Sequence, residues 1–213
     1  METKEYLTIL REEIHSTVFA TVDEQGFPTT RVIDIMLTDD TSLYFITAKG
    51  KNFYRQLLDK RYVSISGMSS KEGSLNKKAI SIRGYVQNIG IQFLEDVFEQ
   101  NPYMSQIYPT KESRIALEVF RLYKGEGEYF DLSSKPITRQ SFLIGDSKAD
   151  ETHSVFGYFI KENCIGCTEC ASLCPQNCIV ITKLPFTIQQ ENCLHCGNCL
   201  STCRYGAVEK KSR

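Results

Sequence analysis

The sequence predicts a two-domain α+β chain: an antiparallel, mainly β barrel followed by a small cysteine-rich α+β domain. The chain has 213 residues, 41% hydrophobic and 24% charged, which suits one ordinary globular domain plus a small one. Before about residue 145, short alternating segments follow one another with few helices between them, which favours an antiparallel barrel over a doubly wound sheet. All nine cysteines lie between Cys164 and Cys203, so the two parts of the chain differ sharply in chemistry.

Charge and hydropathy exclude several classes of protein. The formal net charge is −1, so no overall field favours nucleic acid or an anionic membrane. No apolar run approaches the roughly 18 residues needed to cross a bilayer, and the first residues lack the apolar core of a secretory signal. We therefore expect a cytoplasmic protein with no nucleic-acid partner and no membrane association. In that reducing compartment, clustered cysteines indicate metal binding rather than a disulfide framework.

The chain is predicted to begin with an amphipathic helix over Thr3–His15, because its apolar residues recur at helical spacing. The residues of this apolar stripe are Tyr6, Ile9, Leu10 and Ile14. A strand, a turn and a second strand should follow, since Asp23–Pro28 has turn composition between two β-rich runs.

The remaining β-rich runs alternate or are bounded by turn residues, as strands require. The full set of predicted strands is Thr17–Val22, Thr29–Leu37, Leu43–Ile46, Tyr62–Ser66, Ala79–Ile89, Arg114–Tyr123, Glu128–Leu132 and Arg139–Ile144. Two further helices are predicted between them. Lys51–Lys60 carries apolar residues at helical spacing, and Ile91–Gln100 is ended by Pro102.

The segment Gly145–Ser154 is polar and has no periodicity. This composition predicts a linker at 146–154, between a first domain at 1–145 and a second at 155–213. The second domain contains an internal repeat: a shift of 29 residues places Glu162-Asn163-Cys164 on Glu191-Asn192-Cys193. A repeat this short indicates two copies of one small binding unit.

Each copy of the repeat carries four cysteines at the same spacing, C-x-x-C-x-x-C-x-x-x-C. The first run is Cys164, Cys167, Cys170 and Cys174, and the second is Cys193, Cys196, Cys199 and Cys203. Structural zinc is the alternative, but zinc sites generally use two separated cysteine pairs or cysteine with histidine. Three closely spaced thiolates in each copy fit one face of an iron–sulfur cube better.

This part of the chain resembles a bacterial two-cluster ferredoxin over nearly its whole length. Pro175 follows the first run as in that family, whereas Arg204 replaces the proline after the second run. The resemblance implies two [4Fe–4S] clusters with crossed ligation, in which the fourth cysteine of each run reaches the other cluster. The expected ligand sets are Cys164, Cys167, Cys170 and Cys203 for one cluster, and Cys193, Cys196, Cys199 and Cys174 for the other.

Two residues of the cysteine-rich domain have no place in these ligand sets. Cys178 aligns with Ala207 in the other copy, so we interpret it as a small core residue rather than a ligand. His195 lies between two expected ligands, and we interpret it as an exposed loop residue that tunes a cluster potential at most.

In the first domain, one strand-to-helix turn has the composition of an anion site. Thr47 ends a strand, Gly50 permits a tight turn, Lys49 and Lys51 add positive charge, and the N–H groups that begin the next helix are free. Arg31 lies in the middle of another predicted strand, where a half-buried cation requires an anion or a path to water.

Two longer runs around these residues, Phe19–Val32 and Leu43–Leu57, resemble the FMN-binding split barrels of the pyridoxamine 5'-phosphate oxidase-like family. The resemblance covers about Glu5–Ile144. It implies an antiparallel split β-barrel and an FMN site whose contacts match this chain at Arg31, Val32, Ile33, Thr47, Lys49, Gly50, Lys51 and Asn52. It also implies a homodimer with FMN at its interface.

Less specific readings of the same residues stay open. Lys49 and Lys51 fit solvated turn residues, Arg31 could pair with Asp34 or Glu24, and Asn52 could be only a helix cap. The phosphate site could also lie elsewhere, near Lys77 and Lys78.

FMN exchanges one or two electrons and a cubane exchanges one, so together they connect one-electron donors with two-electron chemistry. We therefore predict a flavin/iron–sulfur oxidoreductase that relays electrons between the clusters and FMN and acts on an unidentified small-molecule acceptor or donor. Its partner is expected to be a redox protein or that small-molecule substrate. Oxidation of pyridoxamine phosphate is not expected, because that reaction passes its electrons to dioxygen, and exposed low-potential clusters are commonly destroyed by oxygen. The alternatives are a non-enzymatic electron-transfer protein and a barrel that binds another ligand such as haem, although only His15 and His153 are available as haem ligands outside the cysteine-rich region.

Overall fold

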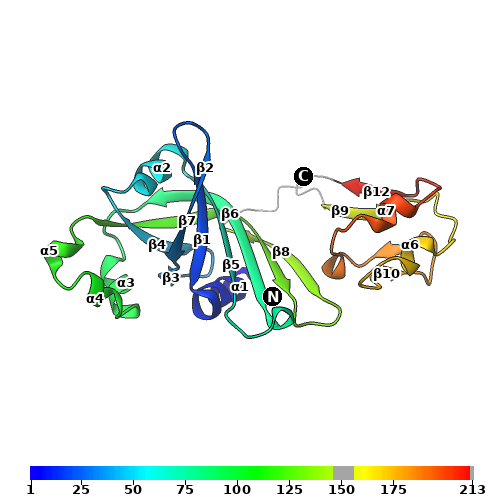
Figure 1. Ribbon diagram of the computed structural model, residues 1–213, viewed down its shortest axis with the longest axis horizontal. Coiled ribbons are helices and arrows are strands. Elements are labelled where there is room, and N and C mark those ends of the chain that lie inside the picture. The colour runs from blue at the N-terminus through cyan, green and yellow to red at the C-terminus, as the bar shows by residue number, and fades with distance from the viewer. Residues whose placement is uncertain (146–155, 212–213) are drawn as a thin grey trace. The chain divides into compact units, whose positions relative to one another are not determined.

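A computed structural model describes residues 1–145 and 156–211 (Figure 1). The chain forms two compact units that do not follow the sequence strictly. The first unit comprises Met1–Glu72, Lys77–Tyr129 and Ser141–Ser147, and the second comprises Gly73–Asn76, Phe130–Gln140 and Lys148–Arg213. A short piece of the β-rich part thus belongs with the cysteine-rich segment. The predicted linker at 146–154 lies outside the described residues.

The first unit begins with the predicted amphipathic helix, which has two parts. The α-helix α1 spans Thr3–Thr8 and continues as a π-helix, η1, over Ile9–Ile14. Its last backbone bond is of the π type, since the N–H of His15 donates to the carbonyl of Leu10 at 2.8 Å. Tyr6, Leu7 and Leu10 are buried against the barrel, close to the predicted stripe.

Eight antiparallel strands form one sheet, in the order β2-β1-β5-β6-β7-β4-β3, with β8 paired to β7. The strands are β1 (Ser16–Val22), β2 (Pro28–Asp34), β3 (Leu37–Thr38), β4 (Leu43–Ala48), β5 (Tyr62–Met68), β6 (Lys78–Asn88), β7 (Leu117–Asp131) and β8 (Thr138–Ile144). The helical elements between them are α2 (Asn52–Lys60), η2 (Ser74–Asn76), α3 (Leu94–Gln100), α4 (Met104–Ile107) and α5 (Lys111–Arg114). The predicted antiparallel split barrel is confirmed.

Two predicted strand boundaries were wrong. The run Thr29–Leu37 is divided, because the N–H of Ile35 still donates to His15 on the β1 side whereas that of Met36 donates to Tyr44 of β4. The predicted strands Arg114–Tyr123 and Glu128–Leu132 are one strand, β7, with Arg114 in α5.

Glycines within β7 and β6 permit a close approach of these two strands. A Cβ on Gly125 would lie 2.4 Å from the carbonyl oxygen of Arg83, and a Cβ on Gly84 would lie 2.5 Å from that of Lys124. Only glycine fits both sides of this approach of β6 to β7, so the strand runs on through the glycines.

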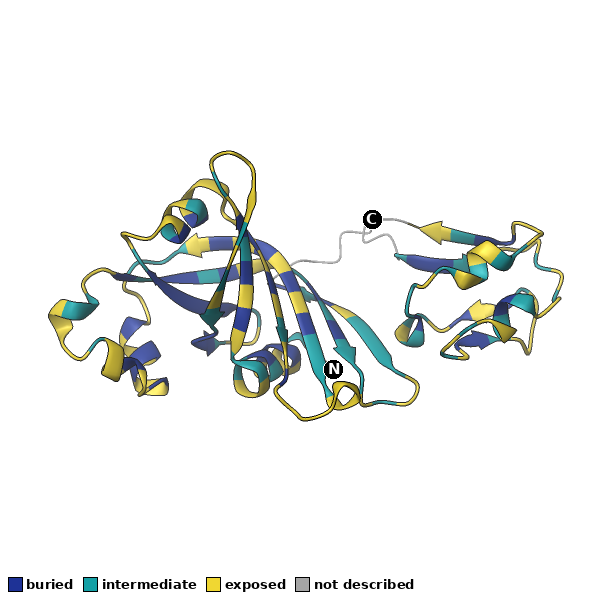
Figure 2. Ribbon diagram, in the orientation of Figure 1, coloured by how far each residue is buried: buried dark blue, intermediate teal, exposed yellow. Residues whose placement is uncertain are grey.

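One face of the sheet packs on the core and the other remains partly exposed, as strand alternation dictates (Figure 2). Phe19, Phe45 and Phe120 are fully buried on the core face. On the outer face, Val18 is 45% exposed and lies opposite Val32, which is 65% exposed, on β2. An apolar patch therefore lies beside the β2 edge of the sheet.

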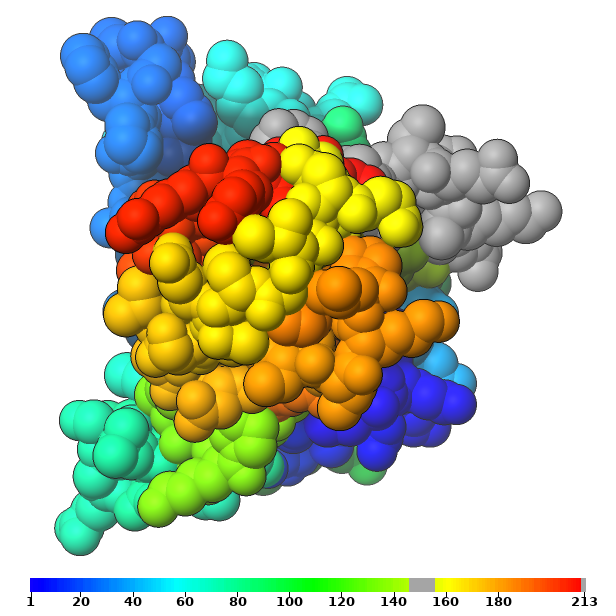
Figure 3. All heavy atoms as spheres, turned by 90° about the vertical axis from the view of Figure 1, so that its right-hand side faces the viewer, coloured from blue at the N-terminus to red at the C-terminus, as the bar shows by residue number. Residues whose placement is uncertain are grey.

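The cysteine-rich segment folds around two small antiparallel ribbons. Strand β9 (Gly157–Ile160) pairs with β12 (Val208–Lys211), and β10 (Ile179–Val180) pairs with β11 (Thr187–Ile188). The short helices are α6 (Glu169–Ser172), η3 (Gln190–Asn192) and α7 (Asn198–Thr202). Figure 3 views this module from one face, with its first copy in yellow to orange and its second in orange to red.

Among residues 1–145 and 156–211, no helix combines the length and the apolar character needed to cross a membrane.

Candidate functional site

The guanidinium group of Arg31 is half-buried on β2 and contacts only neutral groups. It donates to the hydroxyl of Thr21, to that of Thr29 at 2.7 Å and to Gln56 Oε1 at 3.0 Å. It also stacks 4.4 Å from the ring centroid of Phe53, in the first turn of α2. Burial lowers the pKa of Arg31, although an arginine stays charged at neutral pH.

Asp34 and Glu24 were the two carboxylates considered as ion-pair partners of Arg31, and neither pairs with it. Asp34 accepts hydrogen bonds from Ser16 and Tyr103, and Glu24 lies 3.6 Å from Arg55. Among the described residues Arg31 has no ion pair, so the guanidinium remains available to an anion brought by a ligand.

The strand-to-helix turn beside Arg31 contains a buried hydroxyl that lacks a partner. Thr47 at the end of β4 is 3% exposed, and its Oγ1 makes no hydrogen bond within the described residues. Lys51 precedes α2 as its N-cap residue and provides no side-chain cap. An unpaired buried hydroxyl costs free energy unless a ligand completes it.

The structure does not give Asn52 the role of a helix cap, nor Gly50 that of a residue required by the turn. Asn52 is the first residue of α2, not its cap, and its Oδ1 accepts a hydrogen bond from Arg55 at 2.9 Å. A Cβ on Gly50 would meet nothing within 4 Å, and the residue is not in the left-handed region. The chain itself therefore imposes no steric need for glycine at position 50.

Lys49 forms an ion pair with Glu118, whose carboxylate also accepts two hydrogen bonds. Its Nζ lies 3.2 Å from Glu118 Oε1, while Glu118 Oε2 accepts from Tyr54 Oη and Asn88 Nδ2, each at 2.6 Å. These two donors, with a smaller effect of Lys49, lower the pKa of Glu118. Lys49 is thus an ion-paired residue, and Arg31 and Lys51 are the better candidates for an anion contact.

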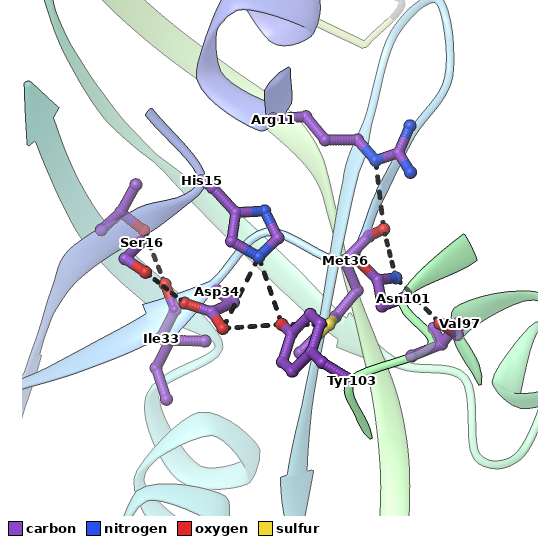
Figure 4. A network of polar contacts seen from close by, with 10 residues as sticks. Arg11, His15, Ser16, Ile33, Asp34, Met36, Val97, Asn101 and Tyr103 are labelled. Carbon is purple, nitrogen blue, oxygen red and sulfur yellow. Dashed lines mark hydrogen bonds and ion pairs between the residues drawn. The ribbon is translucent and has the colours of Figure 1, made fainter. Parts of the chain in front are cut away.

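The end of β2 is fixed by a second polar network (Figure 4). Asp34 accepts from Ser16 Oγ at 2.6 Å and from Tyr103 Oη at 2.7 Å, and His15 Nε2 lies 3.2 Å from Tyr103 Oη. The hydrogen bonds to Ser16 and Tyr103 outweigh burial and lower the pKa of Asp34. The backbone of Val32 and Ile33 therefore lies between two ordered groups, Arg31 and Asp34.

The arrangement fits a phosphate-bearing ligand. A cation without a carboxylate partner, an unsatisfied buried hydroxyl, and the N-terminus of α2 all belong to adjoining segments of the first unit. Helix N-terminal N–H groups with an arginine are a recurrent means of holding phosphate. Arg31, Thr47 and Lys51 could hold the phosphate of FMN.

In the second unit the cysteines line two separate cavities. The first, of about 350 Å³, is lined by Cys164, Cys167, Cys170 and Cys203. The second is lined by Cys174, Cys193, Cys196 and Cys199, and also by a fifth cysteine, Cys178. This grouping, with the fourth cysteine of each run crossing to the other copy, is the one that crossed ligation requires.

The thiols around each cavity surround a space rather than one point. Within the described residues, no three Cys, His, Asp or Glu side chains are close enough to hold a single metal ion. In each cavity the four thiols of the expected ligand set fit a cubane cluster, which takes one ligand from each of those four. Burial raises the pKa of Cys199 to about 11, so a metal centre must displace its proton on binding.

Cys178 is 3% exposed and packs in the core of the module. Its Sγ lies 3.4 Å from Cys174 Sγ, close to the second cavity. The burial agrees with a packing role, and the short distance to Cys174 could not be read from the sequence.

The prediction that His195 is an exposed loop residue was wrong. Its ring is partly buried, its Nδ1 contacts Arg139 Nη1, and the ring of Phe156 packs edge-on at 4.8 Å. The sequence could not show this, because Arg139 lies 56 residues away on β8.

The comparisons identify two classes of domain. Residues 3–129 match the pyridoxamine 5'-phosphate oxidase family, and residues 163–207 match the 4Fe-4S dicluster domain. Since the first match spans more than half of the chain, the chain belongs to the pyridoxamine 5'-phosphate oxidase family, as a split barrel joined to a dicluster ferredoxin domain.

Solved structures support the barrel fold. A NimC/NimA family protein from Clostridium acetobutylicum is 20% identical with a TM-score of 0.55, covering 68% of this chain and 95% of its own. A heme binding protein from Mycobacterium smegmatis is 12% identical with a TM-score of 0.52, covering 66% of this chain and 57% of its own. At these identities the likeness concerns the fold alone. A search of the curated proteins finds no match.

Proposed function

We propose that this protein is a flavin/iron–sulfur oxidoreductase that relays electrons between two [4Fe–4S] clusters and FMN and acts on a small molecule. The main support is that one chain combines two cysteine-lined cavities, each with the four thiols of one expected ligand set, with a barrel whose Arg31 and Thr47 lack the partners that a phosphate would supply. FMN can collect single electrons and deliver them in pairs, which cubanes cannot do. The function thus follows from the pair of sites rather than from either one.

The candidate residues of the barrel would bind FMN, and the electron transfer itself would be carried out by the cofactor. Arg31, Thr47 and Lys51 would hold the phosphate, and the backbone of Val32 and Ile33 would border the flavin. FMN, when bound, supplies one- and two-electron transfer. Electrons would be exchanged with a redox partner protein at the cysteine-rich module, and oxygen-labile clusters suit the reducing cytoplasm.

We also propose a homodimer formed through the outer face of the sheet. Val18 and Val32 lie opposite each other and are largely exposed, and small serines continue the same row, since Val18 also lies opposite Ser66. An apolar, small-residue face beside a sheet edge permits close packing of a second copy about a twofold axis.

The relay is tested by rapid mixing of anaerobically purified protein with a low-potential one-electron donor. Before mixing, the protein should hold about eight Fe per chain, the count for two cubanes, and should release FMN on denaturation. We expect cluster bleaching followed by flavin bleaching, at a rate that does not depend on protein concentration.

Variants that each lack one cofactor serve as the control. Mixing an FMN-depleted Arg31→Gln protein with a protein that lacks both clusters, in which Cys164, Cys167, Cys193 and Cys196 are all replaced by serine, should make flavin reduction slow and concentration-dependent. Flavin that stays oxidised while both clusters are reduced would contradict the relay and leave two cofactors with separate tasks.

Haem in place of FMN is a second candidate, favoured by the likeness to the mycobacterial heme binding protein. His15 is the one described histidine of the barrel, and its Nε2 already lies near Tyr103 and Asp34. An intense Soret band with no extractable flavin would support haem and defeat the flavin proposal.

A further inference from the structure

The two cysteine cavities have equivalent ligands but different surroundings. Under the 29-residue shift that superposes the two copies, His195 corresponds to Gly166. Both residues adopt a left-handed backbone, with φ of 53° and 78° respectively. The histidine is therefore a side chain added to one copy of an otherwise common loop.

A segment from outside the cysteine-rich sequence belongs to the same compact unit and contacts residues next to the ligands of the second cavity. Within Phe130–Gln140, the N–H of Ile137 donates to Gln176 Oε1 at 3.0 Å, and its carbonyl accepts from Asn192 Nδ2 at 3.1 Å. Gln176 is two residues after Cys174, and Asn192 immediately precedes Cys193. Both of these cysteines line the second cavity.

The same segment places a permanently charged guanidinium, that of Arg139, beside the loop that carries two thiols of that cavity. Arg139 Nη1 contacts His195 Nδ1, and the backbone N–H of His195 lies 3.4 Å from Cys193 Sγ. The guanidinium is always protonated and has no acceptor, so it is the donor in this contact. Arg139 thus acts toward the second cavity through a loop that carries two of its thiols, Cys193 and Cys196.

The first cavity has a more open rim. Ile165 and Tyr205 line it and are 56% and 51% exposed. The cation nearest in sequence to its ligands is Arg204, whose side chain is 82% exposed and lies 3.8 Å from Glu169. A solvated, partly neutralised charge has little effect on a nearby centre.

We propose that the segment Phe130–Gln140 makes the two clusters inequivalent, with Arg139 raising the reduction potential of the cluster held by Cys174, Cys193, Cys196 and Cys199. A nearby cation stabilises the reduced cluster, which carries one more negative charge than the oxidised one. The first electron that enters the protein therefore resides on this second cluster. The first cluster, with its open apolar rim, is the site of exchange with an outside redox protein. The inference rests on the two clusters of the proposed function but does not require FMN.

The test is a mediated redox titration of the anaerobic full-length protein, followed by the electron paramagnetic resonance of the reduced clusters. We expect two separate midpoint potentials in the parent. Arg139→Gln should lower the higher one, decreasing the reduced-to-oxidised ratio of that cluster about tenfold at a fixed potential, which corresponds to about 59 mV for one electron. Arg139→Lys, which keeps the positive charge, should retain most of the separation between the two midpoint potentials.

The matched control is Arg204→Gln, which removes the same charge beside Cys203 of the first set and should leave the higher midpoint in place. His195→Gly, which gives the second copy the residue of the first, should also narrow the separation. Unchanged midpoints in Arg139→Gln, or an equal fall of both, would overturn the inference. A protein without about eight Fe would instead defeat the proposed function, so the two failures are distinguishable.

Discussion

Arg31 is distinguished by the partners that it lacks. Arg55 and Arg83 lie beside Glu24 and Glu126, whereas Arg31 is surrounded by hydroxyl and amide oxygens and by the ring of Phe53. A half-buried cation with only neutral partners is costly to the isolated chain, and an anionic ligand offsets that cost.

At this scale we predict that Arg31→Gln weakens FMN binding about tenfold or more, since a charge-assisted phosphate contact contributes roughly 1.5–3 kcal/mol. Quenching of flavin fluorescence on titration of the apoprotein measures the affinity. Arg55→Gln removes an equal charge from α2, the helix that carries Phe53, and should bind FMN within about twofold of the parent. Equal affinities in the parent and Arg31→Gln would place the phosphate elsewhere.

Among the elements, the junction at the end of β2 joins three parts of the barrel. His15 follows the π-helix, Asp34 ends β2, and Tyr103 precedes α4, so their hydrogen bonds tie these segments together (Figure 4). His15 has a φ of 59° and a ψ of −68°, a strained conformation for a residue other than glycine. The network holds the π-helix terminus against β2.

We predict that Tyr103→Phe and Asp34→Asn each destabilise the first unit, with a coupling free energy of about 1 kcal/mol between them. A double-mutant cycle by urea denaturation at pH 7 measures it. The pKa of Asp34 is lowered in the folded state, so its contribution is fully present above the unfolded pKa and is lost as pH falls through the folded one. Additive effects of the two substitutions would show that the hydrogen bond contributes nothing.

For the whole molecule, the exposed face of the sheet is the feature that a second copy would cover. Burying Val18 and Val32 in a twofold interface removes apolar area from water on both copies. The same interface would exclude solvent beside the β2 edge next to Arg31.

We therefore predict that the parent sediments as a dimer and that Val32→Lys shifts it to a monomer, because the new charge would have to be buried. Ile115→Lys places the same charge at a residue that is 70% exposed between α5 and β7, and should leave the dimer intact. Sedimentation velocity measures the masses. A monomeric parent would contradict the proposed dimer.

The features that depend on spacing along the chain could be predicted without a structure. The cysteine runs, the 29-residue repeat, the helix Asn52–Lys60 and the alternating strands are local patterns, so the split barrel and the dicluster module could be predicted from them. The prediction of two strands in place of β7 was wrong, because the close approach of β6 to β7 at Gly84 and Gly125 lets one strand continue and is not visible in local sequence.

Which polar and charged side chains lie in contact could be seen only in the folded structure. The ion pair of Lys49 with Glu118 joins residues 69 positions apart in the sequence, and the contact of Arg139 with His195 joins residues 56 positions apart. The unsatisfied hydroxyl of Thr47 is likewise known only once every neighbour is placed. Charge and polar pairing act through space over a few ångströms, whereas sequence patterns report neighbours along the chain. The two cysteine runs could therefore be predicted from the sequence, and the charged groups around them could not.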